Sequence, residues 1–197
     1  MSRNSPAAAR RLFFALWPDE LQRRALEHAC AKAVRHSGGR PVAVSNLHVT
    51  LAFLGSVAAA RIPELQRSAH ELAARLAHDA PAALTFTHLA HWKEAQILCA
   101  LAPEASPAAR DLAVALQEAA AALGLSPDRK PFQAHVTLAR KVVRPGSLPK
   151  LHPVVWCFET FALIDSRTEP GGPIYSVIDS YPLVSTDNAR DLGRNAP

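Results

Sequence analysis

Short apolar segments of this chain alternate with longer amphipathic segments, a pattern that predicts both strands and helices. The short segments are either continuously apolar or alternate at a period of two, and turn-forming residues bound them. The longer segments carry an apolar stripe at helical spacing. Strands are expected at residues 11–17, 41–44, 47–54, 83–90, 96–101, 132–142, 154–164 and 174–178.

Three amphipathic helices are expected between these strands. Pro and acidic residues at positions 18–20 start the first helix, which runs to about residue 36. The second helix covers residues 62–77, and the third covers residues 106–123, after which Gly124 occupies the usual position for ending a helix. Each helix has one apolar stripe, so each should pack on a sheet.

One pentapeptide, His-Val-Thr-Leu-Ala, occurs at residues 48–52 and again at residues 135–139. Each copy lies in an expected strand, and the elements around the two copies resemble each other imperfectly. The repeat therefore indicates two related halves. Together with several neighbouring hairpins, it predicts an α+β fold: a bilobal pseudo-twofold duplication of mostly antiparallel sheets, with helices packed outside and a central cleft.

The repeated pentapeptide places chemically active side chains on one face of its strand. Successive side chains point to opposite faces, so Val and Leu are expected in the core, while His48 with Thr50 and His135 with Thr137 face a cleft. Imidazole has an ordinary pKa of about 6.5 and exchanges protons near neutral pH. Two imidazoles suit a reaction in which one oxygen loses a proton as it attacks phosphorus while another gains one as it leaves. The Thr hydroxyls suit nonbridging phosphate oxygens.

Two other interpretations of the paired histidines stay open. Each His can be a half-buried strand residue that bonds to backbone. A metallohydrolase that uses His48 and His135 would need further ligands, yet no Asp, Glu or Cys lies beside either motif, so no metal or other cofactor is expected. No third group that orients an imidazole, as in a catalytic triad, is evident, so the Thr hydroxyls are expected to bind phosphate and not to attack it.

Charge and cysteine content add modest information. The 197 residues include 22 Lys and Arg against 17 Asp and Glu, for a net charge of +5 with neutral His. This excess favours an anionic partner such as RNA, although an Ala- and Arg-rich composition explains it equally well. Cys30, Cys99 and Cys157 lie far apart in apolar segments, as expected for thiols in a reducing cytoplasm.

The length suits one domain with a sizeable core. We expect a disordered leader at residues 1–10, a single bilobal domain at residues 11–184 and a C-terminal tail at residues 185–197. The apolar run at residues 12–17 is too short for a signal peptide, and no run approaches the roughly 18 residues that span a membrane. A cytoplasmic monomer without membrane attachment is therefore expected.

The motifs and their surroundings resemble the two-histidine (2H) phosphoesterase superfamily, and within it the RNA 2′,3′-cyclic phosphodiesterases, also called 2′-5′ RNA ligases. The resemblance covers about residues 11–183 and is most specific in the two His-Val-Thr-Leu motifs. Ala134 stands where the family commonly has Pro, which changes local stiffness and not chemistry. Further matching segments are Leu12-Phe13-Phe14-Ala15-Leu16, Asn46-Leu47, Phe53-Leu54-Gly55, Ala139-Arg140, residues 162–166 and residues 172–175.

The resemblance implies a metal-free site in a central cleft that hydrolyses a 2′,3′-cyclic phosphate at an RNA end to a 2′-phosphate. It implies that His48 is the proton donor to the departing 3′ oxygen and His135 the proton acceptor from water, while a pseudosymmetric site also allows the reverse. Ligation, with an RNA 5′-hydroxyl in place of water, is the reverse reaction. The alternatives are a small cyclic nucleotide as substrate, and a non-catalytic RNA-end or nucleotide-binding module.

Two further residues are candidates for substrate binding. Arg140 follows His135 by five residues and points away from it on a regular strand, unless the strand twists or bulges. The family nevertheless favours Arg at this place. A guanidinium here can bind phosphate, and a surface or structural salt bridge is the alternative. Trp92 lies in an expected polar loop at residues 91–94, where it can stack on a nucleobase or cap the edge of a lobe.

Overall fold

The computed structural model describes residues 9–77, 81–104, 106–127, 130–170 and 172–184. These residues have the expected α+β architecture, with antiparallel sheets and helices packed outside them. The helices lie close to their expected positions. They are α1 (Glu20–His36), α2 (Ile62–Leu76) and α3 (Pro107–Ala122), with the short 3₁₀ turns η1 (Val44–Asn46) and η2 (Ala59–Arg61).

Two four-stranded sheets and one strand pair make up the β-structure of the described residues. The strands are β1 (Ala9–Leu16), β2 (Arg40–Pro41), β3 (Val49–Ala58), β4 (Ala82–Phe86), β5 (His88–Trp92), β6 (Ile97–Leu101), β7 (His135–Arg140), β8 (Val154–Phe158), β9 (Thr160–Glu169) and β10 (Gly172–Pro182). The first sheet has the order β10-β9-β1-β3, the second has the order β2-β7-β6-β5, and β4 pairs with β8. Each four-stranded sheet therefore contains one motif strand, β3 or β7.

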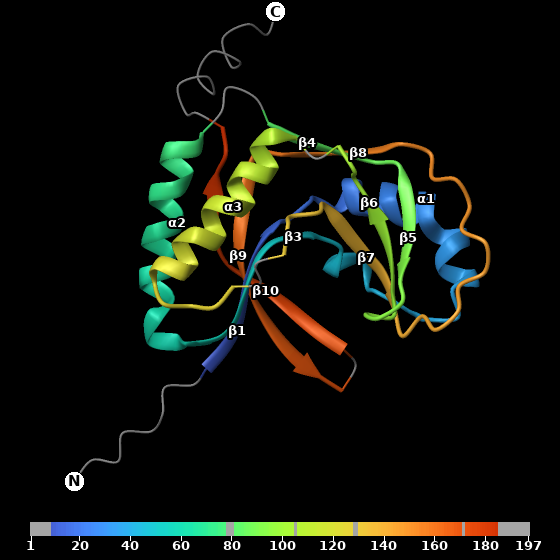
Figure 1. The fold of residues 1–197 in the computed structure, drawn as a ribbon, viewed down its shortest axis with the longest axis horizontal. Coiled ribbons are helices and arrows are strands. Elements are labelled where there is room, and N and C mark those ends of the chain that lie inside the picture. The colour runs from blue at the N-terminus through green and yellow to red at the C-terminus, as the bar shows by residue number, and fades with distance from the viewer. Residues whose placement is uncertain (1–8, 78–80, 105, 128–129, 171, 185–197) are drawn as a thin grey trace, which may run out of the picture.

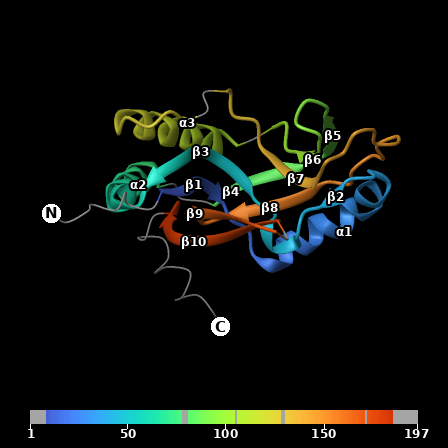
Figure 2. The same ribbon diagram turned by 90° about the horizontal axis from the view of Figure 1, so that it is seen from below.

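The helices cover the outer sides of the two sheets. Helices α2 and α3 pack together against β10 and β3 of the first sheet, whereas α1 lies against β7, β8 and η1. Figures 1 and 2 show α2 and α3 together at one end of the molecule and α1 at the other. Strands β3 and β7 contact each other between these ends, so the two motifs meet at the centre.

Strand β1 shows that the first sheet has apolar packing on both faces. Leu12 and Phe14 join the main core, which includes the apolar stripes of α2 and α3. Phe13 and Ala15 point the other way and form a smaller cluster with Ile164 of β9. A strand buried on both faces is continuously apolar, as this segment is.

Local signals set the ends of α1. Asp19 caps the helix by accepting a hydrogen bond of 2.7 Å from the backbone N–H of Gln22. After the last turn, Gly38 adopts a φ of +65°, a conformation that Gly takes without steric strain. The indole N–H of Trp156 donates to the Gln22 carbonyl at 2.7 Å and fastens the helix to β8.

Two segments expected to be single strands each form two strands in different sheets. Residues 83–90 divide at Thr87, so β4 pairs with β8 while β5 forms the expected hairpin with β6. Residues 154–164 divide at Glu159, so β8 pairs with β4 while β9 pairs with β1 and β10. Alternating hydrophobicity records which face is buried but not which strand lies alongside, so it does not reveal a change of partner.

Several strand ends also differ from expectation. The segment at residues 41–44 pairs with β7 only through Arg40 and Pro41, because η1 begins immediately afterwards. Strand β3 continues past Gly55, where it was expected to end, as far as Ala58. Gly55 has a φ of +71°, so the chain passes this point with a local irregularity and does not turn.

The end of the expected leader forms part of the first sheet. Strand β1 begins at Ala9, so residues 9 and 10 belong to the sheet. The remaining residues of the expected leader and the tail at residues 185–197 lie outside the described residues. In the described part of the chain, no helix combines the length and the apolar composition needed to cross a membrane.

Candidate active site

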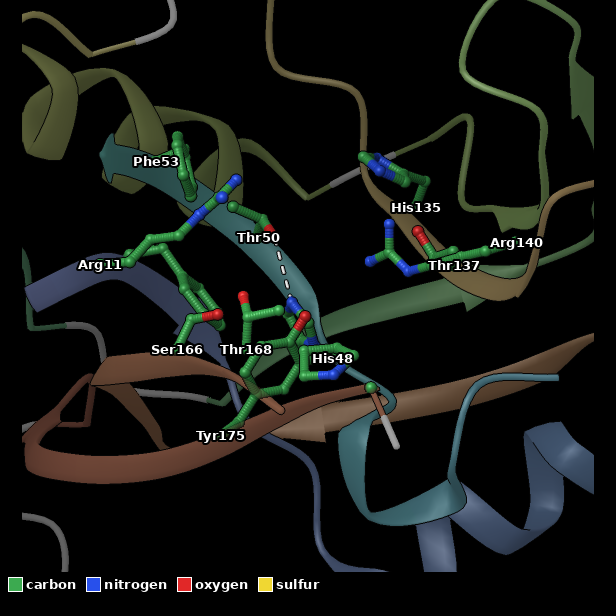
Figure 3. A pocket seen from close by; sticks show the side chains of 13 residues that line it. Arg11, His48, Thr50, Phe53, His135, Thr137, Arg140, Ser166, Thr168 and Tyr175 are labelled. Carbon is green, nitrogen blue, oxygen red and sulfur yellow. Dashed lines mark hydrogen bonds between the residues drawn. The ribbon is translucent and has the colours of Figure 1, made fainter. Parts of the chain in front are cut away.

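The two repeated motifs line a single pocket. The Val and Leu of both copies are at most 3% exposed, as expected, while the His and Thr of both copies face a cavity of about 340 Å³. Figure 3 shows the first motif on one side of the cavity and the second motif on the other. The lining residues are Arg11, Phe13, His48, Thr50, Phe53, His135, Thr137, Arg140, Ser166, Thr168, Gly172, Pro173 and Tyr175.

A backbone carbonyl holds each imidazole through its Nδ1 atom. The Asn46 carbonyl oxygen lies 2.7 Å from Nδ1 of His48, and the Gln133 carbonyl oxygen lies 2.9 Å from Nδ1 of His135. Because a carbonyl oxygen only accepts hydrogen bonds, Nδ1 carries the hydrogen in both rings, which leaves Nε2 as the ring nitrogen available to take up or release a proton. The orienting group that the sequence does not reveal is therefore a main-chain oxygen two residues before each His.

Within the first motif, His and Thr contact each other as their spacing predicts. Oγ1 of Thr50 lies 3.2 Å from Nε2 of His48, as the dashed line in Figure 3 shows. When the imidazole is neutral, Nε2 is an acceptor and the hydroxyl donates to it. The hydroxyl thus lies beside the atom that would transfer a proton.

Aromatic rings enclose His48. The ring centroids of Phe13 and Tyr175 lie 5.0 and 5.2 Å from that of the imidazole, and Trp17 stacks on it at 5.6 Å. The guanidinium of Arg23 lies over the Trp17 ring, 4.7 Å from its centroid. These contacts, with the Asn46 hydrogen bond, hold the imidazole in one orientation.

Burial lowers the pKa of both imidazoles. The pKa of His48 falls to about 4, mainly through burial and further through the nearby His135 and Arg140, while the hydrogen bond to the Asn46 carbonyl opposes the change. Burial also lowers the pKa of His135, against the hydrogen bond to the Gln133 carbonyl. Both rings are therefore mainly neutral in the free protein at pH 7.

A β-bulge turns Arg140 into the pocket. Thr137 and Ala139 of β7 pair with adjacent residues of β6, so Leu138 between them is an extra residue. Side chains of a regular strand point alternately to its two faces, and the extra residue reverses this order beyond Leu138. Arg140 therefore lines the pocket on the same side as His135 (Figure 3). The sequence did not determine which way the Arg140 side chain points, and this one irregularity in strand pairing determines it.

Strand β3 has a bulge at the equivalent position. The extra residue is Leu51, because the residues on either side of it pair with adjacent residues of β1. Phe53 consequently faces the pocket at the place that corresponds to Arg140. The guanidinium of Arg11 lies over the Phe53 ring, 4.9 Å from its centroid, and lines the pocket too. The two motif strands thus share backbone geometry as well as sequence, and each side of the pocket carries an arginine.

Several lining residues were not among the site residues expected from the sequence. Arg11 lies in β1, Ser166 and Thr168 lie in β9, and Tyr175 lies in β10, all far from the motifs along the chain. Period-two spacing puts Ser166 and Thr168 on one face of β9, but the pairing of β9 with β1 decides that this face borders the pocket. The sheet order is needed before the strand pattern can identify these residues.

Trp92 lies at the end of β5 and not in a loop as expected. The turn follows it at residues 93–96. Its ring lies 4.5 Å from the His135 imidazole, tilted by 51°. Trp92 therefore packs beside the second motif, and its use as a platform for a nucleobase stays a prediction.

The described residues provide no ligand set for a metallohydrolase. No group of three or more His, Cys, Asp or Glu side chains among them is arranged to hold a metal ion. Besides His48 and His135, the described residues that line the pocket include no His, Cys, Asp or Glu. Zinc sites take three or four such ligands, so this set of side chains suits proton transfer to and from a bound anion better than metal binding.

Comparisons with known proteins agree with the motifs and the fold. The family model for the 2′-5′ RNA ligase superfamily matches residues 17–166. The RNA 2′,3′-cyclic phosphodiesterase of Thermus thermophilus is 33% identical over 186 residues, which cover 88% of this chain and 90% of that protein. The RNA 2′,3′-cyclic phosphodiesterase of Escherichia coli is 32% identical over 140 residues, which cover 71% of this chain and 76% of the relative.

Solved structures resemble this one over almost their whole length. The crystal structure of E. coli LigT complexed with 3′-AMP matches with a TM-score of 0.78 and 28% identity, over 90% of this chain and 99% of that chain. The crystal structure of TT0787 of T. thermophilus matches with a TM-score of 0.75 and 28% identity, over 89% and 99% of the two chains. The chain belongs to the 2′-5′ RNA ligase superfamily.

Proposed function

We propose that this protein hydrolyses RNA 2′,3′-cyclic phosphate ends to 2′-phosphates without a metal. The observation that carries the proposal is the pair of carbonyl-anchored imidazoles, His48 and His135, on two sides of one pocket. Two arginines supply positive charge for a phosphate in the same pocket. The relatives named RNA 2′,3′-cyclic phosphodiesterase and the LigT structure complexed with 3′-AMP support this substrate class.

In the proposed reaction, each His moves one proton through Nε2. His135 accepts a proton from water as the water oxygen forms a bond to phosphorus. The bond between phosphorus and the ribose 3′ oxygen breaks, and His48 donates its proton to that oxygen, which leaves a 2′-phosphate. Thr50 and Thr137 bind nonbridging oxygens, and Arg140 stabilises their negative charge.

His48 takes up its proton from solvent when the substrate binds. The free pocket favours neutral imidazoles, because burial lowers the pKa of both rings. A bound phosphate anion favours the protonated form of a neighbouring imidazole and so raises its pKa. The substrate itself therefore helps to charge the general acid. Ligation through the reverse reaction would use the same residues with their roles exchanged.

The pH dependence of kcat/KM tests this arrangement. The active form has one protonated and one neutral His, so kcat/KM falls above the higher apparent pKa of the pair, where the acid loses its proton, and below the lower one, where the base gains a proton. Both pKa values are lowered, that of His48 to about 4, so the maximum is expected on the acidic side of neutrality. The kcat profile should lie at higher pH because the bound phosphate favours imidazolium. A flat profile, or a kcat/KM maximum above pH 7, contradicts this prediction.

Identification of the product tests the function directly. Short oligonucleotides that end in a 2′,3′-cyclic phosphate are incubated with the protein, with and without EDTA, beside the matching nucleoside 2′,3′-cyclic phosphate. We expect a 2′-phosphate at equal rates in both conditions. A 3′-phosphate contradicts the proposed bond cleavage, and loss of activity in EDTA contradicts the metal-free mechanism. Tight binding of the oligonucleotide without turnover indicates an RNA-end binding module. Turnover of the nucleoside 2′,3′-cyclic phosphate but not of the oligonucleotide indicates a small cyclic nucleotide as substrate.

A further inference from the structure

A groove leads out of the reaction pocket on one side. It shares seven lining residues with the pocket, including His48, Thr137 and Arg140, and then continues between two walls. One wall is the segment at residues 40–46 with the end of β7, and the other is the hairpin of β9 and β10. Its volume of about 940 Å³ compares with about 340 Å³ for the pocket. Sites for single small molecules reach roughly 300–1,000 Å³, so the groove is large enough for a nucleotide beyond the reaction pocket.

The first wall of the groove carries unpaired positive charge. Arg40 lies directly opposite Arg140 across β2 and β7, and Lys141 follows Arg140 in the chain. Directly opposite residues of an antiparallel pair point to the same face, where like charges destabilise the pairing. Among the described residues, no ion pair or side-chain hydrogen bond with another residue involves any of these three cations. An external anion would relieve this repulsion.

The backbone geometry brings these cations together at the groove. A Cβ atom on Gly39 would collide with the side chain of Val142 and with the Arg140 carbonyl oxygen, so only glycine allows this close approach to β7. Lys141 adopts a φ of +59°, a left-handed conformation that is unfavourable for a residue with a Cβ. Lys141 is exposed and lines the groove from this position. Such local strain persists where the surrounding structure enforces it.

The rest of the groove suits the sugar and base of a nucleotide. Val42 and Pro173 line it, and Ile174, 42% exposed, lies on the hairpin wall. The Asn46 amide donates a hydrogen bond of 2.8 Å to the Pro173 carbonyl and joins the two walls. Glu169 is the carboxylate among the described lining residues, so the three cations outnumber it.

We infer that this groove holds the RNA strand on the 5′ side of the cyclic phosphate, with Arg40 and Lys141 on its phosphodiester groups. The inference rests on the proposed function. A 2′,3′-cyclic phosphate closes the 3′ end of an RNA, so the rest of the chain leaves through the 5′ oxygen of the terminal ribose. The groove is continuous with the reaction pocket and carries the charge that phosphodiesters require. Arg40 and Lys141 therefore make the protein prefer an RNA end over a mononucleotide.

The double variant Arg40→Ala with Lys141→Ala tests this role. We expect kcat/KM for a cyclic-phosphate oligonucleotide to fall by about tenfold at low salt, with kcat/KM for the nucleoside 2′,3′-cyclic phosphate within about twofold of wild type. In a plot of the logarithm of RNA affinity against the logarithm of salt concentration, each contact to a phosphate of single-stranded RNA contributes about −0.7 to the slope. The double variant loses two such contacts, so its slope should be less steep by about 1.4. An equal loss on both substrates, or no loss on either, overturns the inference.

Three matched variants separate position from charge. Arg75→Ala with Arg110→Ala removes two exposed cations from the helices α2 and α3 and should keep the preference for the oligonucleotide. Arg40→Lys with Lys141→Arg keeps the charges and should keep most of the preference. Glu169→Gln removes the opposing carboxylate and should tighten oligonucleotide binding. Loss of preference in the helix variant, or weaker binding in Glu169→Gln, contradicts the assignment.

Binding of the reaction product distinguishes this inference from the proposed function. A fluorescent oligonucleotide that ends in a 2′-phosphate reports affinity by anisotropy without any turnover. Weaker binding by the double variant, at an unchanged thermal unfolding midpoint, supports the groove even if the wild-type protein hydrolyses neither substrate. Equal affinity of the wild type and the double variant overturns the groove assignment even if hydrolysis is normal.

Discussion

Replacing either His48 or His135 with Ala is expected to lower kcat/KM for a cyclic-phosphate oligonucleotide by about 10²- to 10⁴-fold, the usual contribution of a general acid or base. Both residues transfer a proton in the same step, so the double variant should lose little more activity than the worse single variant. Initial rates with 5′-labelled oligonucleotides measure these losses. A single variant with nearly normal activity would exclude its His from proton transfer.

Folding and binding controls make this result specific. His70 and His88 lie outside the pocket on exposed surface, so Ala at either position provides a matched control that should keep normal activity. The thermal unfolding midpoints of all variants should be compared with that of the wild type. His48 is half-buried at the wall of the pocket, and removing its neutral imidazole enlarges the pocket without leaving an unpaired charge, so the His48→Ala variant should remain folded.

A substrate with a sulfur leaving group tests which His is the acid. A cyclic phosphorothiolate with sulfur in place of the 3′ oxygen releases a thiolate, which needs no proton. If His48 is the donor, His48→Ala should recover most of its lost rate on this substrate while His135→Ala should not. Recovery in His135→Ala alone would reverse the two roles, a result that the pseudosymmetric pocket allows.

Thr50 and Thr137 should bind the phosphate through their hydroxyl groups. Thr→Val keeps the shape of the side chain but removes the donor, so each variant should lose roughly 1–3 kcal/mol of binding or transition-state stabilisation, a fall of about 5- to 150-fold in kcat/KM. Thr→Ser keeps the donor and should keep most of the activity. A Thr→Val variant as active as its Thr→Ser counterpart would contradict this role.

Mass spectrometry of protein quenched during turnover excludes or establishes a covalent route. A Thr nucleophile would leave a phosphothreonine, whereas attack by water leaves the protein unmodified. The groups that hold Nδ1 of the two imidazoles are the carbonyl oxygens of Asn46 and Gln133, whereas the triad of a hydroxyl nucleophile uses a carboxylate there. We expect Thr50 and Thr137 to be unmodified. A phosphorylated peptide that contains either residue would show that the Thr, and not water, attacks phosphorus first.

The sequence determined those features that depend on local periodicity and on turn residues. Proline, acidic residues and glycine marked the helix ends, and α1 lies where residues 18–39 predicted it. The period of two in the repeated pentapeptide placed Val and Leu in the core, with His and Thr on the pocket side. These properties follow from local backbone geometry and from hydrogen bonds between residues that are close in the chain, and a short stretch of sequence specifies both.

The tertiary structure decided which distant segments share a sheet and where their pairing is irregular. The bulge at Leu138 turned Arg140 into the pocket, and breaks at Thr87 and Glu159 sent adjacent strands to different partners. Arg11 reached the pocket because β1 pairs with β3. Strand pairing and bulges arise from contacts between segments that are far apart in the chain, and hydrophobic alternation along one segment contains no information about its partner.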